Sequence, residues 1–270
     1  SPEAARIVEQ FFEKKWIDAE IRPGKQGGGF CCQTTPDLHP YILVNYTGHL
    51  RDVLTVAHEL GHGLHQYLAR KVGILESDAP LTMAETASVF GEMLIFDRVL
   101  GEVKDPKERL ALLCGKIDDN FSTVFRQIAM TEFEIKAHQA GIKDGELSEE
   151  VLNGFWMESN RELYGSSVAL TDNYRHGWKY IPHFVHTPFY CYAYAFAQLF
   201  VLSLYQKYKE VGPAEFVPKY LNMLSLGGSQ KPEDLAAAMG LDLTAPDFWR
   251  SGLDLLNSLV SEAETLAARG

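Results

Sequence analysis

The sequence predicts a mainly α-helical protein with a small β-region near its N-terminus. From Arg51 onward apolar residues recur with helical periodicity almost to the end, and the only clear strand signal is two short β-prone runs at 29–34 and 41–46. A chain of 270 residues with 46% hydrophobic content can bury one large core or two modest ones. Because no repeat, low-complexity tract or Ser- or Pro-rich linker interrupts it, we expect a single domain over 1–270.

The first helix should begin at the chain start, with Ser1 as the capping residue and Pro2 in the first turn. Its apolar face continues through FFEKKW, so we expect it to end near Arg22-Pro23-Gly24. Glycines and prolines then separate the two strands. Beyond them, turn signals at 73–80, 101–106, 141–148, 165–178 and 226–235 divide the chain into seven or more helices.

The apolar segment 189–205 could be mistaken for a membrane span. It has 17 residues and includes Gln198 and several tyrosines, whereas a spanning helix needs about 20 apolar residues. The segment is therefore expected to form a buried helix, with no membrane partner.

Charge and cysteine content restrict the function. The formal net charge is −11 with acidic residues spread along the chain, so there is no basic stripe for a nucleic acid partner. The four cysteines, at 31, 32, 114 and 191, have no C-x-x-C spacing, which fits neither a disulfide framework nor a cysteine zinc site. A reducing, cytoplasmic location is expected.

The glycines of GKQGGGF are only a weak indication of a phosphate-binding loop, because no lysine-serine pair follows them.

The segment LTVAHELGHGLHQYL, residues 54–68, carries the strongest chemical signal. His58 and His62 are four residues apart and lie on one helix face, while Glu59 lies about 100° round the helix at the edge of the same site. Two imidazoles can bind zinc in this arrangement while the carboxylate accepts a proton from water. In a random chain of this length and composition, the expected number of H-E-x-x-H motifs is roughly 0.02. The alternative is that both histidines are core residues whose ring nitrogens are hydrogen-bonded within the protein.

A catalytic zinc site needs a third protein ligand. His65 lies two turns from His58, too far along a straight helix to share the metal, and is expected to be a pocket residue or to support a ligand. The longer zinc motif would require Gly at 65 and His at 68, but Leu68 stands there. Glu85 on the following helix, among small residues, is a candidate ligand. Glu92 could support a ligating histidine or be exposed.

Several separated motifs resemble one family. GKQGGGFCC, PYILVNYTG, HELGHGLHQYL, MAETASVFGEML and IPHFVHTPFYCYAYAFAQ, in this order along the chain, resemble the oligoendopeptidase F branch of the thimet oligopeptidase family of zinc metallopeptidases, over nearly all of the chain. The resemblance implies a zincin-like helical catalytic domain whose small β-sheet edges the active-site cleft. It implies one Zn²⁺ per chain, held by His58, His62 and Glu85, with Glu59 as general base. Family members carry a helical region before this portion, which we expect this chain to lack.

The resemblance also implies hydrogen-bond donors to the substrate carbonyl, namely His183 and one of Tyr190 or Tyr192. Helical spacing puts Tyr190 and Tyr194 on one face and Tyr192 on another, unless the helix starts only after Tyr192. Alternatively, these tyrosines are core aromatics. An extended peptide could pair with the cleft strand through its main chain, which predicts broad specificity.

The expected function is that of a zinc-dependent metalloendopeptidase that hydrolyses internal bonds of short unstructured peptides. Zinc would acidify the attacking water, and Glu59 would accept its proton and deliver it to the leaving amine. One alternative is a zinc carboxypeptidase, for which Arg161, Arg175 or Lys179 could anchor a terminal carboxylate. A second is a non-catalytic, metal-stabilised helical binding module, although a structural zinc site has no need of Glu59. No oligomeric state follows from the sequence.

Overall fold

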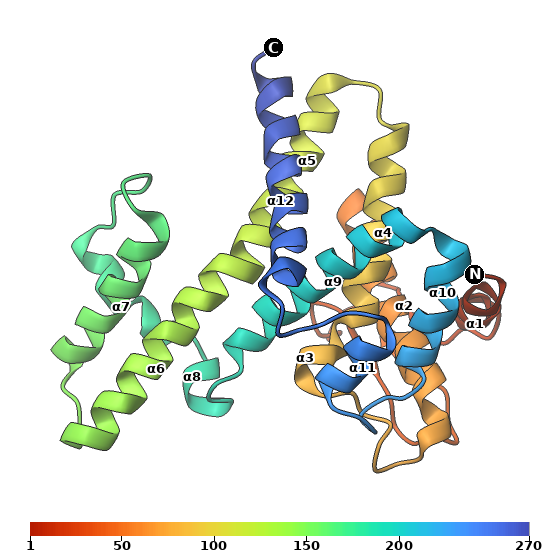
Figure 1. The fold of residues 1–270 in the computed structure, drawn as a ribbon, viewed down its shortest axis with the longest axis horizontal. Coiled ribbons are helices and arrows are strands. Elements are labelled where there is room, and N and C mark those ends of the chain that lie inside the picture. Colours follow the sequence, from red (N-terminus) through yellow and green to blue (C-terminus); the bar gives the residue numbers. More distant parts are fainter. Residues whose placement is uncertain (270) are drawn as a thin grey trace. The chain divides into compact units, whose positions relative to one another are not determined.

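A computed structural model describes residues 1–269, and Figure 1 shows the elements they form. The chain divides into two compact units: the first comprises Ser1–Cys114 and the chain from Leu199 onward, and the second comprises Gly115–Gln198. The boundaries fall within helices α5 (Pro106–Phe121) and α9 (Cys191–Val211). The mainly α-helical fold with a small sheet is confirmed, while a single domain over 1–270 stays a prediction.

The first unit holds the three strands and most of the helices. Its strands are β1 (Ile17–Asp18), β2 (Phe30–Cys32) and β3 (Tyr41–Leu43). Besides its parts of α5 and α9, its helices are α1 (Pro2–Glu13), α2 (Leu50–Ala69) with a 3₁₀ turn at Arg70–Val72, α3 (Leu81–Ala84), α4 (Thr86–Glu102), α10 (Pro213–Leu224), α11 (Pro232–Ala238) and α12 (Pro246–Ala267).

Helix α1 begins as predicted but ends earlier. The Ser1 hydroxyl accepts a hydrogen bond from the Ala4 N–H at 3.4 Å. The predicted end near Arg22 is wrong, because Lys15 adopts a left-handed conformation with φ of 57°. The N–H groups of Lys15 and Trp16 then donate to the carbonyls of Phe12 and Phe11, at 3.2 and 2.9 Å, which closes the helix in a Schellman motif. The chain leaves the helix and forms β1, a strand that the sequence did not predict.

The sheet has the order β1-β3-β2. Strand β1 runs parallel to β3 with Ile17 opposite Ile42, and β2 runs antiparallel to β3 with Cys31 opposite Ile42. Strands β2 and β3 lie inside the predicted runs 29–34 and 41–46, which confirms both. The order places β2 at an edge of the sheet.

Helix α2 has two differently occupied faces. One face carries Val56, Leu60, Leu64 and Tyr67, which pack with Ile7, Phe11, Ile42 and Val44 from α1 and the sheet. The opposite face packs along α4, and Figure 1 shows these two helices side by side. The packing is close because a Cβ at Gly61 would overlap the backbone of Ala87 and Ser88. This contact brings the histidine face of α2 against the start of α4.

The second unit is built on two long helices, α6 (Gln127–Asp144) and α7 (Glu149–Tyr164). A π-helical turn at Ser122–Arg126 precedes α6, 3₁₀ turns at Asp172–Tyr180 follow α7, and α8 covers His183–His186. Trp156 is 1% exposed in the core of this unit, and its indole N–H donates to the Tyr174 carbonyl at 3.0 Å. The 3₁₀ turns therefore close over α7, within a region predicted to be irregular.

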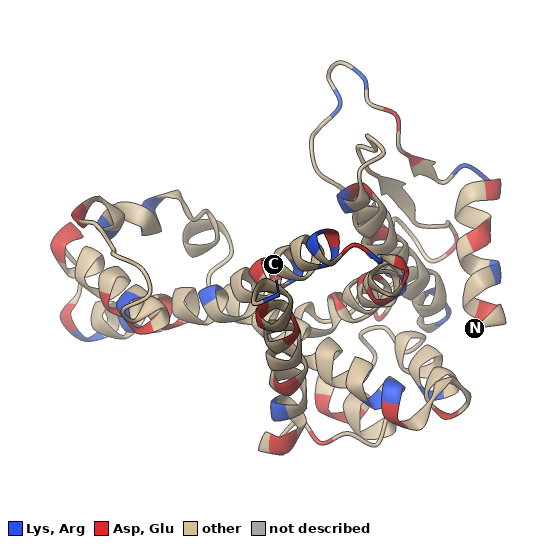
Figure 2. Cartoon of the chain, turned by 90° about the horizontal axis from the view of Figure 1, so that it is seen from above, with Lys and Arg blue, Asp and Glu red and all other residues tan. Residues whose placement is uncertain are grey.

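The predicted buried helix is confirmed from Cys191, where α9 begins, and its residues Phe200, Val201 and Leu202 are completely buried. The first two residues of the predicted segment 189–205 precede the helix. Among residues 1–269, no helix combines the length and the apolar character needed to cross a membrane. Figure 2 shows Lys and Arg scattered among Asp and Glu along the described helices.

Candidate metal centre and active site

The predicted ligands come together in the first unit. His58 and His62, one turn apart on α2, have ring centroids 4.9 Å apart. Glu85 lies at the junction of α3 and α4, and its Oε2 lies 3.3 Å from Nε2 of each histidine. One potential ligand atom from each of the three residues lies within 4.8 Å of the others. The structure thus assembles the trio that the sequence proposed, although Glu85 occupies a bend rather than the interior of a helix.

The distances from the Glu85 oxygen to the two histidine nitrogens fit a zinc ion. Zinc binds imidazole nitrogen and carboxylate oxygen at about 2.0–2.2 Å in a tetrahedral arrangement, which puts neighbouring ligand atoms about 3.3 Å apart. Both nitrogen-to-oxygen distances have that value of 3.3 Å. Two imidazoles and one carboxylate also form the donor set that catalytic zinc uses with one position left open.

Neighbouring side chains orient two of the ligands. The buried Ser88 hydroxyl donates to Glu85 Oε2 at 2.6 Å, which holds the carboxylate against the histidines. Glu92 Oε2 lies 3.4 Å from Nδ1 of His58, on the opposite side of the ring from Glu85. A carboxylate at Nδ1 favours a proton there and leaves Nε2 free to bind a metal. The structure therefore favours the supporting role among the two roles considered for Glu92, and it adds Ser88, which the sequence analysis treated only as a small residue.

The charges in the trio depend on one another. Burial by itself lowers the pKa of His58, but hydrogen bonds to Glu85 and Glu92 raise it to about 10. Burial raises the pKa of Glu85, but hydrogen bonds from His58 and His62 bring that pKa far below its usual range. In the absence of metal, a proton on histidine thus compensates the carboxylate. A metal cation would take over this role, so its binding should release protons.

Glu59 is 6% exposed and lies close to strand β2. A Cβ at Gly29, the residue before β2, would lie 3.1 Å from Glu59 Oε1 and 3.4 Å from the Leu43 carbonyl oxygen. Glycine at this position therefore lets the strand approach the carboxylate. Burial raises the pKa of Glu59, while the charges of His58 and His62 oppose the rise. A raised pKa suits a group that accepts and then returns a proton near neutral pH.

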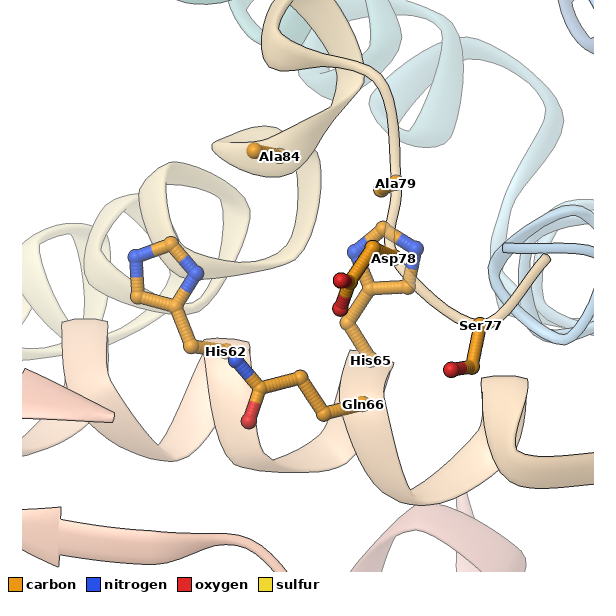
Figure 3. A pocket seen from close by; sticks show the side chains of 7 residues that line it. All are labelled: His62, His65, Gln66, Ser77, Asp78, Ala79 and Ala84. Carbon is orange, nitrogen blue, oxygen red and sulfur yellow. The ribbon is translucent and has the colours of Figure 1, made fainter. Parts of the chain in front are cut away.

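His65 lines a cavity beside the trio, as predicted for a pocket residue. The cavity has a volume of about 170 Å³, and Figure 3 shows its lining. His62, His65 and Gln66 come from α2, Ser77, Asp78 and Ala79 from the loop after it, and Ala84 from α3. His65 is 6% exposed, and burial lowers its pKa to about 4, so the ring is neutral at pH 7.

His183, Tyr190 and Tyr192 all belong to the second unit. His183 starts α8, and its Nε2 lies 3.3 Å from the Tyr194 hydroxyl. The Tyr190 ring lies 5.6 Å from the His183 ring and 5.0 Å from the Tyr194 ring, whereas Tyr192 is 46% exposed. The predicted grouping of Tyr190 with Tyr194 is therefore confirmed, and Tyr194 joins His183, a contact that sequence spacing could not show.

The cations considered as anchors for a peptide terminus also belong to the second unit. Lys179 Nζ lies 2.6 Å from Glu149 Oε1, and Arg175 Nη1 lies 3.2 Å from Asp172 Oδ2. Both charges are already engaged by carboxylates of the same unit. This arrangement gives no support to Arg175 or Lys179 as an anchor. Arg161, the third candidate, lies in the last turn of α7.

Comparisons with known proteins identify the family of the chain. The model of peptidase family M3 matches residues 4–255. An oligoendopeptidase F homologue of Lactococcus lactis subsp. lactis is 33% identical over 97% of this chain and 43% of its own length, and oligopeptidase PepF of Bacillus subtilis is 30% identical over 98% and 39%. The crystal structure of oligoendopeptidase-F from Enterococcus faecium matches 82% of this chain and 40% of its own, with a TM-score of 0.71 and 28% identity.

The chain thus spans less than half the length of these relatives. The family match nevertheless includes the second unit, most of the first unit and all of the candidate site residues. The resemblance to oligoendopeptidase F that the motifs predicted is confirmed, and the chain belongs to peptidase family M3.

Proposed function

We propose that the protein is a zinc-dependent metalloendopeptidase that hydrolyses internal bonds of short, unstructured peptides. The observation that carries the proposal is the trio of His58, His62 and Glu85, whose ligand atoms have the spacing of a zinc site, with the buried Glu59 carboxylate adjoining it in sequence. Membership of peptidase family M3 supports the same reaction class.

In this proposal the trio holds one zinc ion, and when bound the ion supplies Lewis acidity that acidifies water and polarises a peptide carbonyl. Glu59 accepts a proton from the attacking water and delivers it to the leaving amine. Its raised pKa makes the carboxylate basic enough for the first transfer and its acid form able to perform the second. Glu92 and Ser88 keep His58 and Glu85 in their binding orientations.

The edge strand β2 is the proposed binding surface for the substrate backbone. Strand β3 occupies one side of β2 in the sheet order, and Gly29, the residue before β2, leaves room for Glu59. An extended peptide that pairs with such an edge is recognised by its main chain, so many sequences can bind. His183 and Tyr190 or Tyr192 are proposed to donate hydrogen bonds to the carbonyl under attack, as the family resemblance implies.

Mass spectrometry of a mixture of unstructured peptides tests the proposal. The mixture is incubated with the zinc-loaded chain and, in parallel, with its Glu59→Gln variant. We expect internal cuts with the unsubstituted chain, and a loss of at least about 100-fold in the rate for the variant, which retains its zinc. Metal analysis of both proteins is the control.

Stepwise loss from peptide C-termini would replace the proposal by a carboxypeptidase. Loss of zinc from the Glu59→Gln variant would contradict the role of Glu59 as base rather than ligand. Full zinc occupancy of the trio without any cleavage would favour the non-catalytic binding module.

A further inference from the structure

The cavity beside the metal trio has the size of one amino-acid side chain. Its volume is about 170 Å³, and a cavity of roughly 150 Å³ can hold a benzene molecule. His62, a proposed metal ligand, forms one wall, and Ala84 next to Glu85 forms another. A side chain in this cavity would therefore belong to a residue close to the peptide bond that meets the metal. We call this cavity the Asp78 pocket.

The negative charge in the lining of the Asp78 pocket comes from one residue. Of its seven lining residues, Asp78 alone carries a carboxylate, and none is Lys or Arg. His65 is neutral at pH 7 because burial lowers its pKa. The Gln66 amide is occupied by Cys31: its Oε1 accepts from the Cys31 thiol at 3.2 Å, and its Nε2 donates to the Cys31 carbonyl at 3.5 Å. Asp78 is thus the negatively charged group that the lining offers to a bound side chain.

The loop 73–80 holds Asp78 in place over the cavity. The Gly228 N–H donates to the Glu76 carbonyl at 2.7 Å, and a Cβ at Gly228 would overlap the Asp78 carbonyl oxygen. Ser77, next to Asp78, is only 3% exposed. Figure 3 shows the Asp78 carboxylate pointing from this loop toward the space between His62 and His65. The backbone of the loop is thus anchored while the carboxylate remains accessible at the pocket.

We propose that the Asp78 pocket is a specificity subsite that binds the side chain of a lysine or arginine next to the scissile bond. The proposal rests on the proposed peptidase function. The methylene stem of such a side chain would lie along Ala79 and Ala84, and its cationic head would approach Asp78. Peptide recognition would then combine main-chain pairing at β2, which is indifferent to sequence, with a preference for one basic residue.

Peptide binding tests the subsite without turnover. The probes are fluorescent, otherwise neutral decapeptides with lysine, norleucine or glutamate at one central position, and the protein is the zinc-loaded Glu59→Gln chain. Because Asp78 is exposed, we expect fluorescence anisotropy to show about threefold to fivefold tighter binding of the lysine peptide than of the norleucine peptide. The glutamate peptide should bind most weakly.

Asp78→Asn in the same background should abolish the difference between lysine and norleucine. Glu76→Gln removes an equal charge from the same loop outside the pocket lining, so this control should keep the preference. Equal binding of both peptides to the chain with Asp78 would overturn the proposal. So would a lysine preference that survives Asp78→Asn, or a failure of all three peptides to bind.

Cleavage by the zinc-loaded chain that retains Glu59 separates the two proposals. Cuts adjacent to lysine, reduced by Asp78→Asn, support both. Lysine-selective binding without any cleavage would leave the subsite standing and contradict the peptidase function. Cleavage that is indifferent to lysine at every position near the cut would keep the function and remove the subsite.

Discussion

Replacement of Gly61 by alanine should weaken zinc binding, although Gly61 is not one of the proposed ligands. The added Cβ would lie 2.5 Å from Ser88 Cα, whereas ordinary contact begins at 3.4 Å, so α4 must withdraw by about 0.9 Å. Overpacking of this kind costs about 1–3 kcal/mol of folding free energy. The same movement displaces Glu85, which immediately precedes α4, from its place 3.3 Å from His58 and His62.

Zinc sites tolerate deviations of about 0.2 Å in their ligand distances, several times less than this movement. We therefore expect Gly61→Ala to weaken zinc binding by at least about 100-fold, measured by competition with a chromophoric chelator. Gly101→Ala is the matched control, because it makes the same change within α4 where nothing lies within 4 Å of the added Cβ. A Gly61→Ala variant that folds, as judged by circular dichroism, and keeps the original affinity would refute the packing argument.

Three further outcomes are expected. Glu92→Ala should weaken zinc binding about 10- to 100-fold, because His58 loses the carboxylate at Nδ1; an unchanged affinity in the chelator assay would contradict that role. The pKa of His65 is lowered to about 4, so the unfolded chain takes up a proton first as pH falls below 6.5. Between pH 6.5 and 4, the unfolding free energy of the metal-free protein should therefore fall by up to about 3 kcal/mol more than that of the His65→Gln variant, as measured by denaturant titrations. If the unfolding free energies of the two proteins fall in parallel with pH, His65 is not neutral in the folded protein. Gly29→Ala should crowd the Glu59 carboxylate and lower the peptide cleavage rate roughly tenfold with zinc still bound; an unaltered rate would show that the strand can adjust.

The limits of sequence reasoning are clear at the start of the chain. Ser1 and Pro2 correctly indicated where α1 begins, because capping depends on residues within one turn. The end was misplaced because the apolar pattern continues through Trp16. Lys15 nevertheless takes a left-handed conformation, and Trp16 packs on Phe11 with ring centroids 5.2 Å apart. Tertiary packing outweighs local helix preference there, and it also creates the unpredicted strand β1.

By itself, the sequence determined that His58 and His62 share a face and that Glu59 adjoins them, because the geometry of one helix fixes neighbours four residues apart. It suggested Glu85 through the composition around that residue and through family resemblance. Only the tertiary structure decided which carboxylate oxygen faces the histidines, that Glu92 supports His58, and that Asp78 overlooks a cavity beside His62. These contacts join separate segments, and they depend on how closely α2 and α4 pack at Gly61, a distance that no local pattern encodes.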